Sequence, residues 1–186
     1  MADLQLNPNT ALGQDAPGII VIGGLTITER DDTALASLAT RQGRAVDVAR
    51  AAAVAGIPLP GPGHSEVGQL AAFWLGPDQW MIEAPFASHA DIRAALLPMF
   101  GDAASITEQT DAWVRFDLSG DLPAVLERLT NFDFRSAADS AATRTVIDHL
   151  GCYLIRRSAQ LVTIYGPRSS AQSLHHALVE AAGSVL

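Results

Sequence analysis

Two stretches, "WLGPDQWMIEAPFASHADIRAALL" (residues 74–97) and "IRRSAQLVTIYGPRSSAQSLHHALV" (residues 155–179), follow one pattern, and this pattern decides the predicted fold. Each predicts a strand, a tight turn and a second strand, followed by a proline and an apolar rhythm that is typical of a helix. In the first stretch, Gly76, Pro77 and Asp78 provide the turn, because proline presets one backbone dihedral angle. A hairpin that leads into a helix therefore occurs twice.

A strand-to-helix unit precedes each hairpin. In the first unit, residues 33–43 are compatible with either a helix or a short strand, and residues 44–56 predict a helix with Val46, Ala49 and Ala53 on one stripe. In the second unit, residues 112–120 predict a strand and residues 119–129 a helix with Pro123 in its first turn. The order βαββα thus appears twice, which is typical of ferredoxin-like units.

We therefore expect an α+β fold made of two ferredoxin-like βαββα halves in one compact unit. Residues 1–18 are polar and rich in turn residues, which predicts a flexible N-terminal arm. Residues 19–186 then form a single domain, with pseudo-repeated halves at about 19–104 and 105–186. The similarity between the halves is one of pattern more than of identity.

Two connecting segments lead to specific expectations. Residues 57–68 contain three prolines and three glycines and are expected to form a loop. Residues 88–100 predict a helix that opens with a capping pattern, Ser88 and Asp91 three residues apart. Its buried face is expected to carry Ile92, Leu96 and Met99, and Pro98 is expected to end or bend it.

The composition excludes several classes of protein. The net charge of −8 disfavours nucleic acid as a partner, because phosphate binding needs clustered cations. All twelve basic residues are arginine, so a lysine Schiff base and a phosphate-loop lysine are excluded. The single cysteine, Cys152, excludes an internal disulfide and a site with several thiolate ligands.

Charge and hydropathy also bear on location and assembly. No apolar segment approaches the length of a membrane span, and no secretory signal is recognised at the N-terminus, so a cytoplasmic protein is expected. Charged residues make up only 17% of the chain, against about 25% for a typical soluble domain. This low fraction suggests a surface that is partly buried against another subunit, although the 32 alanines also raise the apolar count.

No constellation of residues indicates catalysis or a resident cofactor. The histidines lack zinc-site spacing, Cys152 is expected to be an inert buried thiol, and Gly23-Gly24 lacks the third glycine of a dinucleotide site. We accordingly expect no catalytic, cofactor-binding or metal-binding residue in this chain. Trp74 and Trp80, on opposite arms of the hairpin, are expected to pack in the core or an interface rather than stack on a ligand.

Three arginines are the remaining candidates for ligand binding. Arg156, Arg157 and Arg168 could bind a carboxylate or phosphate, because a guanidinium group forms bidentate contacts. Arg168 is the best placed for a small anion, since it begins the last predicted helix, where backbone amides also favour anions. Surface arginines more often pair with nearby acids, so an ordinary ion pair is the competing interpretation.

Four blocks of the sequence together resemble one family. They are "WLGPDQWMI" (74–82), "ITEQTDAWVRFDLSGDLPAVLERL" (106–129), "RTVIDHLGCYLIRR" (144–157) and "YGPRSSAQSLHHAL" (165–178). In this order and spacing they are similar to the gamma subunit of heterotetrameric sarcosine oxidase, over roughly residues 25 to 183.

The resemblance implies both a fold and an assembly. The fold would be similar to the folate-binding domain of glycine-cleavage aminomethyltransferases, and a strand would be favoured for residues 33–43. The complex contains alpha, beta, gamma and delta subunits and converts sarcosine to glycine, with hydrogen peroxide and formaldehyde or 5,10-methylenetetrahydrofolate as the other products. FAD, FMN and NAD are expected on the large subunits and zinc on delta, while the gamma family has no catalytic motif to transfer.

Two alternatives remain open at this point. An independent folate-dependent enzyme of the aminomethyltransferase type would need a carboxylate that grips folate, and Glu108 and Asp111 are the available candidates. A stand-alone module for small anions would use Arg168 and the last helix.

Overall fold

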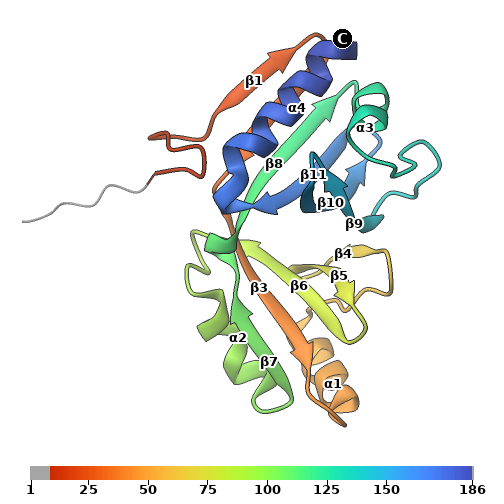
Figure 1. Ribbon diagram of the computed structural model, residues 1–186. Helices are drawn as coiled ribbons and strands as arrows, with labels where there is room; N and C mark the ends of the chain where they lie inside the picture. Colours follow the sequence, from red (N-terminus) through yellow and green to blue (C-terminus); the bar gives the residue numbers. More distant parts are fainter. Residues whose placement is uncertain (1–8, 186) are drawn as a thin grey trace, which may run out of the picture.

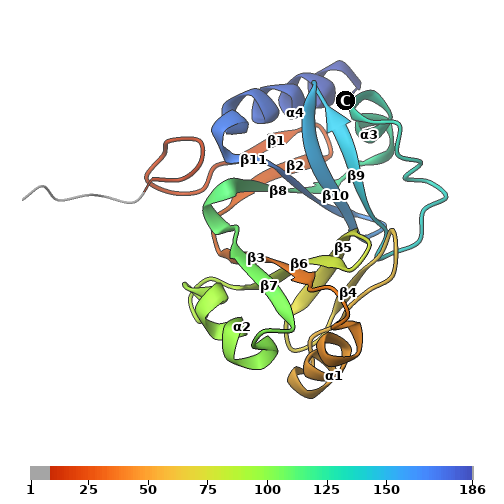
Figure 2. The same cartoon turned by 60° about the horizontal axis from the view of Figure 1, so that its bottom comes forward.

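Two antiparallel sheets pack face to face, and helices cover the outer side of each sheet (Figure 1, Figure 2). The computed structural model describes residues 9–185. The six-stranded sheet contains, in spatial order, β1 (Ile19–Ile22), β2 (Leu25–Arg30), β8 (Trp113–Gly120), β11 (Leu161–Pro167), β10 (Leu150–Ser158) and β9 (Ala142–Ile147). The five-stranded sheet contains β4 (Ser65–Val67), β5 (Ala71–Gly76), β6 (Gln79–Pro85), β3 (Thr33–Thr40) and β7 (Ala104–Glu108).

The helices divide between the two sheets. The helices α1 (Ala45–Ala55) and α2 (Ile92–Phe100) pack on the five-stranded sheet, and α3 (Pro123–Leu129) and α4 (Ala171–Val185) pack on the six-stranded sheet. Single 3₁₀ turns, η1 (Thr110–Ala112) and η2 (Arg168–Ser170), precede β8 and α4. Helix, sheet, sheet and helix therefore form four successive layers.

Each sheet has the ferredoxin-like strand order, but in each sheet the strand beside the first strand of the unit comes from the other half of the chain. In the five-stranded sheet, β3, α1, β5, β6 and α2 form the βαββα unit, and β7 pairs with the free edge of β3. In the six-stranded sheet, β8, α3, β10, β11 and α4 form the second unit, and β2 occupies the equivalent place beside β8. The predicted α+β fold with two ferredoxin-like units is confirmed, while the exchange of β2 and β7 is a feature that periodicity did not predict.

The hairpin predicted around Gly76, Pro77 and Asp78 forms as expected. Trp74 and Trp80 are direct partners across β5 and β6, and the connection consists of Pro77 and Asp78. Asp78 has a φ of 58°, so the residue after the proline adopts the left-handed conformation that tight turns use. The ambiguous residues 33–43 form β3, which is the outcome that the family resemblance implied.

Two helices bury a different stripe from the one predicted. In α1 the buried residues are Val48 and Ala52, whereas Val46 is 79% exposed. In α2 Phe100 takes the buried position expected for Met99, and Ile92 and Leu96 are buried as predicted; the helix ends at Phe100, two residues after Pro98. The error arises because several stripes of these alanine-rich helices are apolar, and the sheet beneath selects one of them.

The cap of α2 and the loop before β5 also differ from expectation. Asp91, not Ser88, caps α2, since its carboxylate accepts a hydrogen bond from the amide of Ala94 at 2.9 Å. Within the predicted loop 57–68, residues 65–67 form β4 and pair with β5. A three-residue edge strand is too short to leave a periodic pattern in the sequence.

Residues 9–18, the second part of the predicted arm, are held against β2. The carboxylate of Glu29, only 2% exposed, accepts hydrogen bonds from the amides of Leu12 at 3.0 Å and Gly18 at 3.3 Å. Residues 1–8 of the predicted arm lie outside the described residues.

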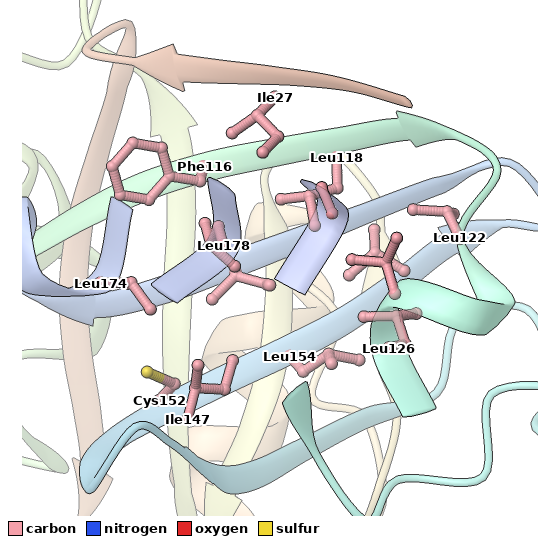
Figure 3. Packing of buried hydrophobic residues seen from close by; sticks show 14 of the residues in the cluster. Ile27, Phe116, Leu118, Leu122, Leu126, Ile147, Cys152, Leu154, Leu174 and Leu178 are labelled. Atoms are coloured by element: carbon pink, nitrogen blue, oxygen red, sulfur yellow. The ribbon is translucent and has the colours of Figure 1, made fainter. Parts of the chain in front are cut away.

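Three apolar cores correspond to the three interfaces between layers. Figure 3 shows the core under α4, where Leu174 and Leu178 lie over the sheet that carries Phe116 and Leu118, with Cys152 at its border. A second core joins α1 and α2 to the five-stranded sheet. The third, between the sheets, consists of Leu35, Phe73, Met81, Ala142, Ile155 and Tyr165.

Candidate functional site

The best candidate site is a polar network that lies beside the apolar core between the sheets. Along β8, Val114, Phe116 and Leu118 are buried on the side of α4, so the alternate residues Arg115 and Asp117 point toward the other sheet. On β11, Thr163 is the direct cross-strand partner of Asp117, and Tyr165 is that of Arg115. The remaining members are Arg157 of β10 and Glu83 of β6.

The first part of the network is an arginine–carboxylate pair on β8. Arg115 donates from Nε and Nη2 to the two carboxylate oxygens of Asp117, at 3.0 and 2.8 Å. The hydroxyl of Thr163 also donates to Asp117, at 2.8 Å. Nη1 of Arg115 donates to Thr33 of β3 at 2.7 Å, so the pair also binds the opposite sheet. A bidentate pair of this kind fixes both side chains in one orientation.

The second part connects the two sheets directly. Arg157 donates from Nε to Thr163 at 3.1 Å and from Nη2 to Oε1 of Glu83 at 2.5 Å. The hydroxyl of Tyr165 donates to the same Oε1 of Glu83, also at 2.5 Å. Glu83 is 6% exposed and Tyr165 1%, so this carboxylate and phenol are both withdrawn from water.

The electrostatics of the network agree with its geometry. Burial raises the pKa of Tyr165 well above its usual value, and the nearby carboxylate of Glu83 raises it further, so the phenol keeps its proton. Burial alone would lower the pKa of Arg115, whereas the hydrogen bond to Asp117 and the charges of Asp117 and Glu83 raise it, and the net shift is upward. Because two arginines face two carboxylates, the formal charges of the network cancel.

The network borders a pocket of about 410 Å³ between the sheets. Its polar lining includes Asp32, Thr33, Glu83, Arg115 and Arg157. Its other lining residues are Val67, Gly68, Gln69, Leu70, Ala71, Ala84 and Pro85. Half of these twelve lining residues are polar or charged and half are apolar or glycine, so the pocket offers both hydrogen-bonding groups and apolar wall to a small molecule.

Sequence reasoning found only part of this site. Of the network residues, Arg157 is the one that the sequence offered as a candidate for anion binding. Glu83 and Tyr165 were missed. One signal was present, because Glu83 is the single charged residue in the otherwise apolar strand segment "WMIEAP" (80–85).

The other arginine candidates lie apart from the network. Arg168 lies in η2 rather than in α4 itself, and its Nη2 donates to the backbone oxygen of Asn9 at 3.2 Å. Its binding of a small anion remains a prediction. Arg156 donates to the backbone oxygens of Phe134 and Ala137 at 2.6 and 2.5 Å, so it holds the segment before β9 in place.

The carboxylates considered for folate do not line the 410 Å³ pocket. Glu108 accepts hydrogen bonds from the amide of Arg93 at 3.2 Å and from the hydroxyl of Thr110 at 2.5 Å. Its side chain therefore supports the start of α2. Asp111 is exposed in η1.

The histidine and cysteine candidates lie outside the network as well. His175 lies 5.7 Å from the ring of Phe116, whereas His176 contacts Glu180 of the same helix at 3.6 Å, so the two adjacent imidazoles diverge. Cys152 is completely buried, and this burial raises the pKa of its thiol to about 11. Among residues 9–185, no three His, Cys, Asp or Glu side chains are grouped as a metal site requires.

Of the two hairpin tryptophans, Trp80 has a packing role. Trp80 packs against the core beneath α1 and α2, and its indole donates to the backbone oxygen of Pro60 at 2.9 Å. This bond connects the hairpin to the preceding loop.

Across residues 9–185, the helices are all too short or too polar to cross a lipid bilayer.

Comparison with solved structures places this architecture among known folds. One chain of heterotetrameric sarcosine oxidase from Corynebacterium sp. U-96, solved in complex with pyrrole 2-carboxylate, matches with a TM-score of 0.76 over 88% of each chain and 22% sequence identity. The two chains share one fold. Glycine cleavage system aminomethyltransferase T from Bartonella henselae matches with a TM-score of 0.63 and 15% identity, over 85% of this chain and 46% of that enzyme.

The structural matches test the predicted fold. The predicted likeness to sarcosine oxidase and to the aminomethyltransferase fold is confirmed at the level of the fold. No protein-family model and no curated protein sequence matches this chain.

Proposed function

We propose that this chain is a non-catalytic subunit, of the gamma type, in a heterotetrameric sarcosine oxidase complex. The observation that carries the proposal is the match to a sarcosine oxidase chain over 88% of both lengths, because it leaves little of either chain unaccounted for. In this proposal the alpha, beta and delta subunits are the partners, and they hold FAD, FMN, NAD and zinc. The complex demethylates sarcosine oxidatively in the cytoplasm.

The surface of the chain supports an assembled state. Several large apolar side chains are exposed, among them Val54 at 86% and Met99 at 47%, which line a groove of about 510 Å³ beside α1 and α2. Ile19 and Val21 are exposed on the edge strand β1. Together with the low fraction of charged residues, this suits a protein that buries surface against larger subunits.

The interior supports a role without chemistry in this chain. The carboxylates and arginines of the network are paired with one another, and the thiol of Cys152 is buried with a raised pKa. An independent aminomethyltransferase is less well supported, since the chain spans only 46% of such an enzyme and Glu108 supports α2.

Purification from the native source tests the proposal. A tagged chain expressed at its natural level should co-purify with flavin-containing subunits, and the preparation should produce hydrogen peroxide when sarcosine is added. The isolated chain should show no turnover. Purification without flavoprotein partners, or sarcosine turnover by the isolated chain, contradicts the proposal.

A further inference from the structure

One oxygen atom of the buried network has no partner. Oε1 of Glu83 accepts two hydrogen bonds, from Arg157 and Tyr165, whereas Oε2 has none among residues 9–185, although it is fully buried. A buried carboxylate oxygen without a hydrogen bond destabilises the folded protein, because burial removes its bonds to water and no protein donor replaces them. The side chain of Glu83 lines the pocket of about 410 Å³.

A donor group that is not used within the network lies on the neighbouring arginine. Arg157 directs Nε to Thr163 and Nη2 to Glu83, and neither bond uses Nη1. Arg157 lines the same pocket as Glu83. The residues that line the pocket thus include a carboxylate with one unpartnered oxygen and an arginine with one nitrogen that neither bond uses.

The charges around the pocket limit what it can bind. Glu83 pairs with Arg157, Asp117 with Arg115, and Asp32 with Arg30. Because these pairs cancel, a simple anion gains little net attraction. A molecule that is neutral or zwitterionic overall fits better. Leu70, Val67 and Pro85 add apolar wall that suits a small carbon skeleton.

We propose that this pocket binds a small molecule that presents an N–H donor beside an oxygen acceptor. The N–H group donates to Oε2 of Glu83, and the oxygen accepts from Nη1 of Arg157. Two kinds of molecule share this chemistry, a zwitterionic amino acid and a neutral cyclic amide. The proposal concerns the residues of this chain alone and does not depend on its assembly with flavoproteins.

Titration of the full chain with glycine and, separately, with 2-pyrrolidone tests the proposal by calorimetry or by amide chemical shifts. At least one probe should bind in the millimolar range. Binding by glycine alone identifies a zwitterion site, and binding by 2-pyrrolidone alone identifies an amide site. If neither probe binds at tens of millimolar, the proposal is overturned.

The variant Glu83→Gln isolates the oxygen in question. The carboxamide oxygen can still accept from Arg157 and Tyr165, while an NH₂ group replaces Oε2 and repels an N–H donor. Affinity should fall roughly tenfold or more, the loss expected when a buried hydrogen bond is replaced by two opposed donors. The matched control is Glu66→Gln, an exposed glutamate on β4 outside this pocket, which should bind like the wild type.

Unchanged affinity in Glu83→Gln overturns the proposal. If this variant does not fold, the crystal structure of the wild-type chain soaked in the probe that binds decides the question. Density within hydrogen-bond distance of Oε2 of Glu83 supports the proposal, and density only elsewhere overturns it.

Discussion

At the scale of single residues, the hydrogen bond from Tyr165 to Glu83 joins the two sheets. The phenol is buried and has a raised pKa, so it is a hydrogen-bond donor throughout the physiological range. Its acceptor lies 82 positions away in sequence, on the opposite sheet. Removing this donor costs a buried hydrogen bond and leaves Oε1 of Glu83 with Arg157 as its one remaining donor among the described residues.

Tyr165→Phe should therefore destabilise the protein by about 1–2 kcal/mol. The matched control is Tyr153→Phe, because the Tyr153 ring packs against Phe73 and Trp113 while its hydroxyl has no hydrogen bond in the part of the chain that the structure describes. The control should change stability by less than about 0.5 kcal/mol. Urea unfolding of both variants measures the difference, and equal losses would contradict the assigned role of the phenol.

Cys152 gives a pH dependence whose sign follows from its burial. Burial raises the pKa of the folded thiol from 9.0 to about 11, so the unfolded chain releases this proton at a lower pH than the folded chain does. The free energy of unfolding should then fall as the pH rises from 9.0 to about 11. Urea titrations across this interval should show a smaller fall for Cys152→Ala, and an equal fall in both proteins rules the thiol out as the cause.

At the scale of elements, the start of α2 illustrates how the structure chooses between two capping residues. Ser88 and Asp91 both have the chemistry of an N-cap, and the sequence pattern favoured Ser88. In the structure Ser88 bonds to Pro85 and His89 in the turn after β6, and Asp91 caps the helix. The choice depends on where the chain leaves β6, which is set by the pairing of β6 with β3.

Asp91→Ala should lower stability by about 1 kcal/mol, because the amide of Ala94 loses its acceptor. Ser88→Ala should change stability by less than about 0.5 kcal/mol, since its contacts are exposed. Chemical denaturation of the two variants provides the comparison. A greater loss in Ser88→Ala than in Asp91→Ala would show that the cap is misassigned.

A second element shows a turn that the sequence pattern concealed. The strands β9 and β10 are joined through Asp148 and His149, whose φ angles are 46° and 66°. Two consecutive left-handed residues form the type I′ turn that suits a two-residue hairpin. The sequence pattern did not indicate this turn, because glycine or asparagine usually occupies such positions.

At the scale of the whole molecule, the exchange of β2 and β7 makes the two halves depend on each other. The first half supplies β1 and β2 to the six-stranded sheet, and the second half supplies β7 to the five-stranded sheet. Neither half can complete its own sheet, so an isolated half leaves the edge of β3 or β8 uncovered.

A chain divided between α2 and β7 should test this dependence. Fragments 1–102 and 103–186 should each be largely unfolded alone, and should fold together when mixed, since the division falls in an exposed turn. Circular dichroism and urea unfolding of the separate and mixed fragments measure this. Cooperative unfolding of either fragment by itself would contradict the interdependence of the halves.

The amino-acid sequence by itself determined the repeated βαββα pattern, most of its strands and helices, and the buried thiol of Cys152. These features follow from local periodicity, turn residues and composition, which act over a few neighbouring positions. The segment 33–43 was one exception, since its apolar residues suited either kind of element, and the short strand β4 was another.

Only the tertiary structure decided which stripe of α1 is buried, which residue caps α2, and which sheet receives β2 and β7. It also brought Glu83 together with Arg157 and Tyr165, which lie 74 and 82 positions further along the chain. Such contacts depend on the packing of one sheet on the other, and local sequence carries no record of that packing. For this reason the candidate site, unlike the order of its strands, emerged only from the folded molecule.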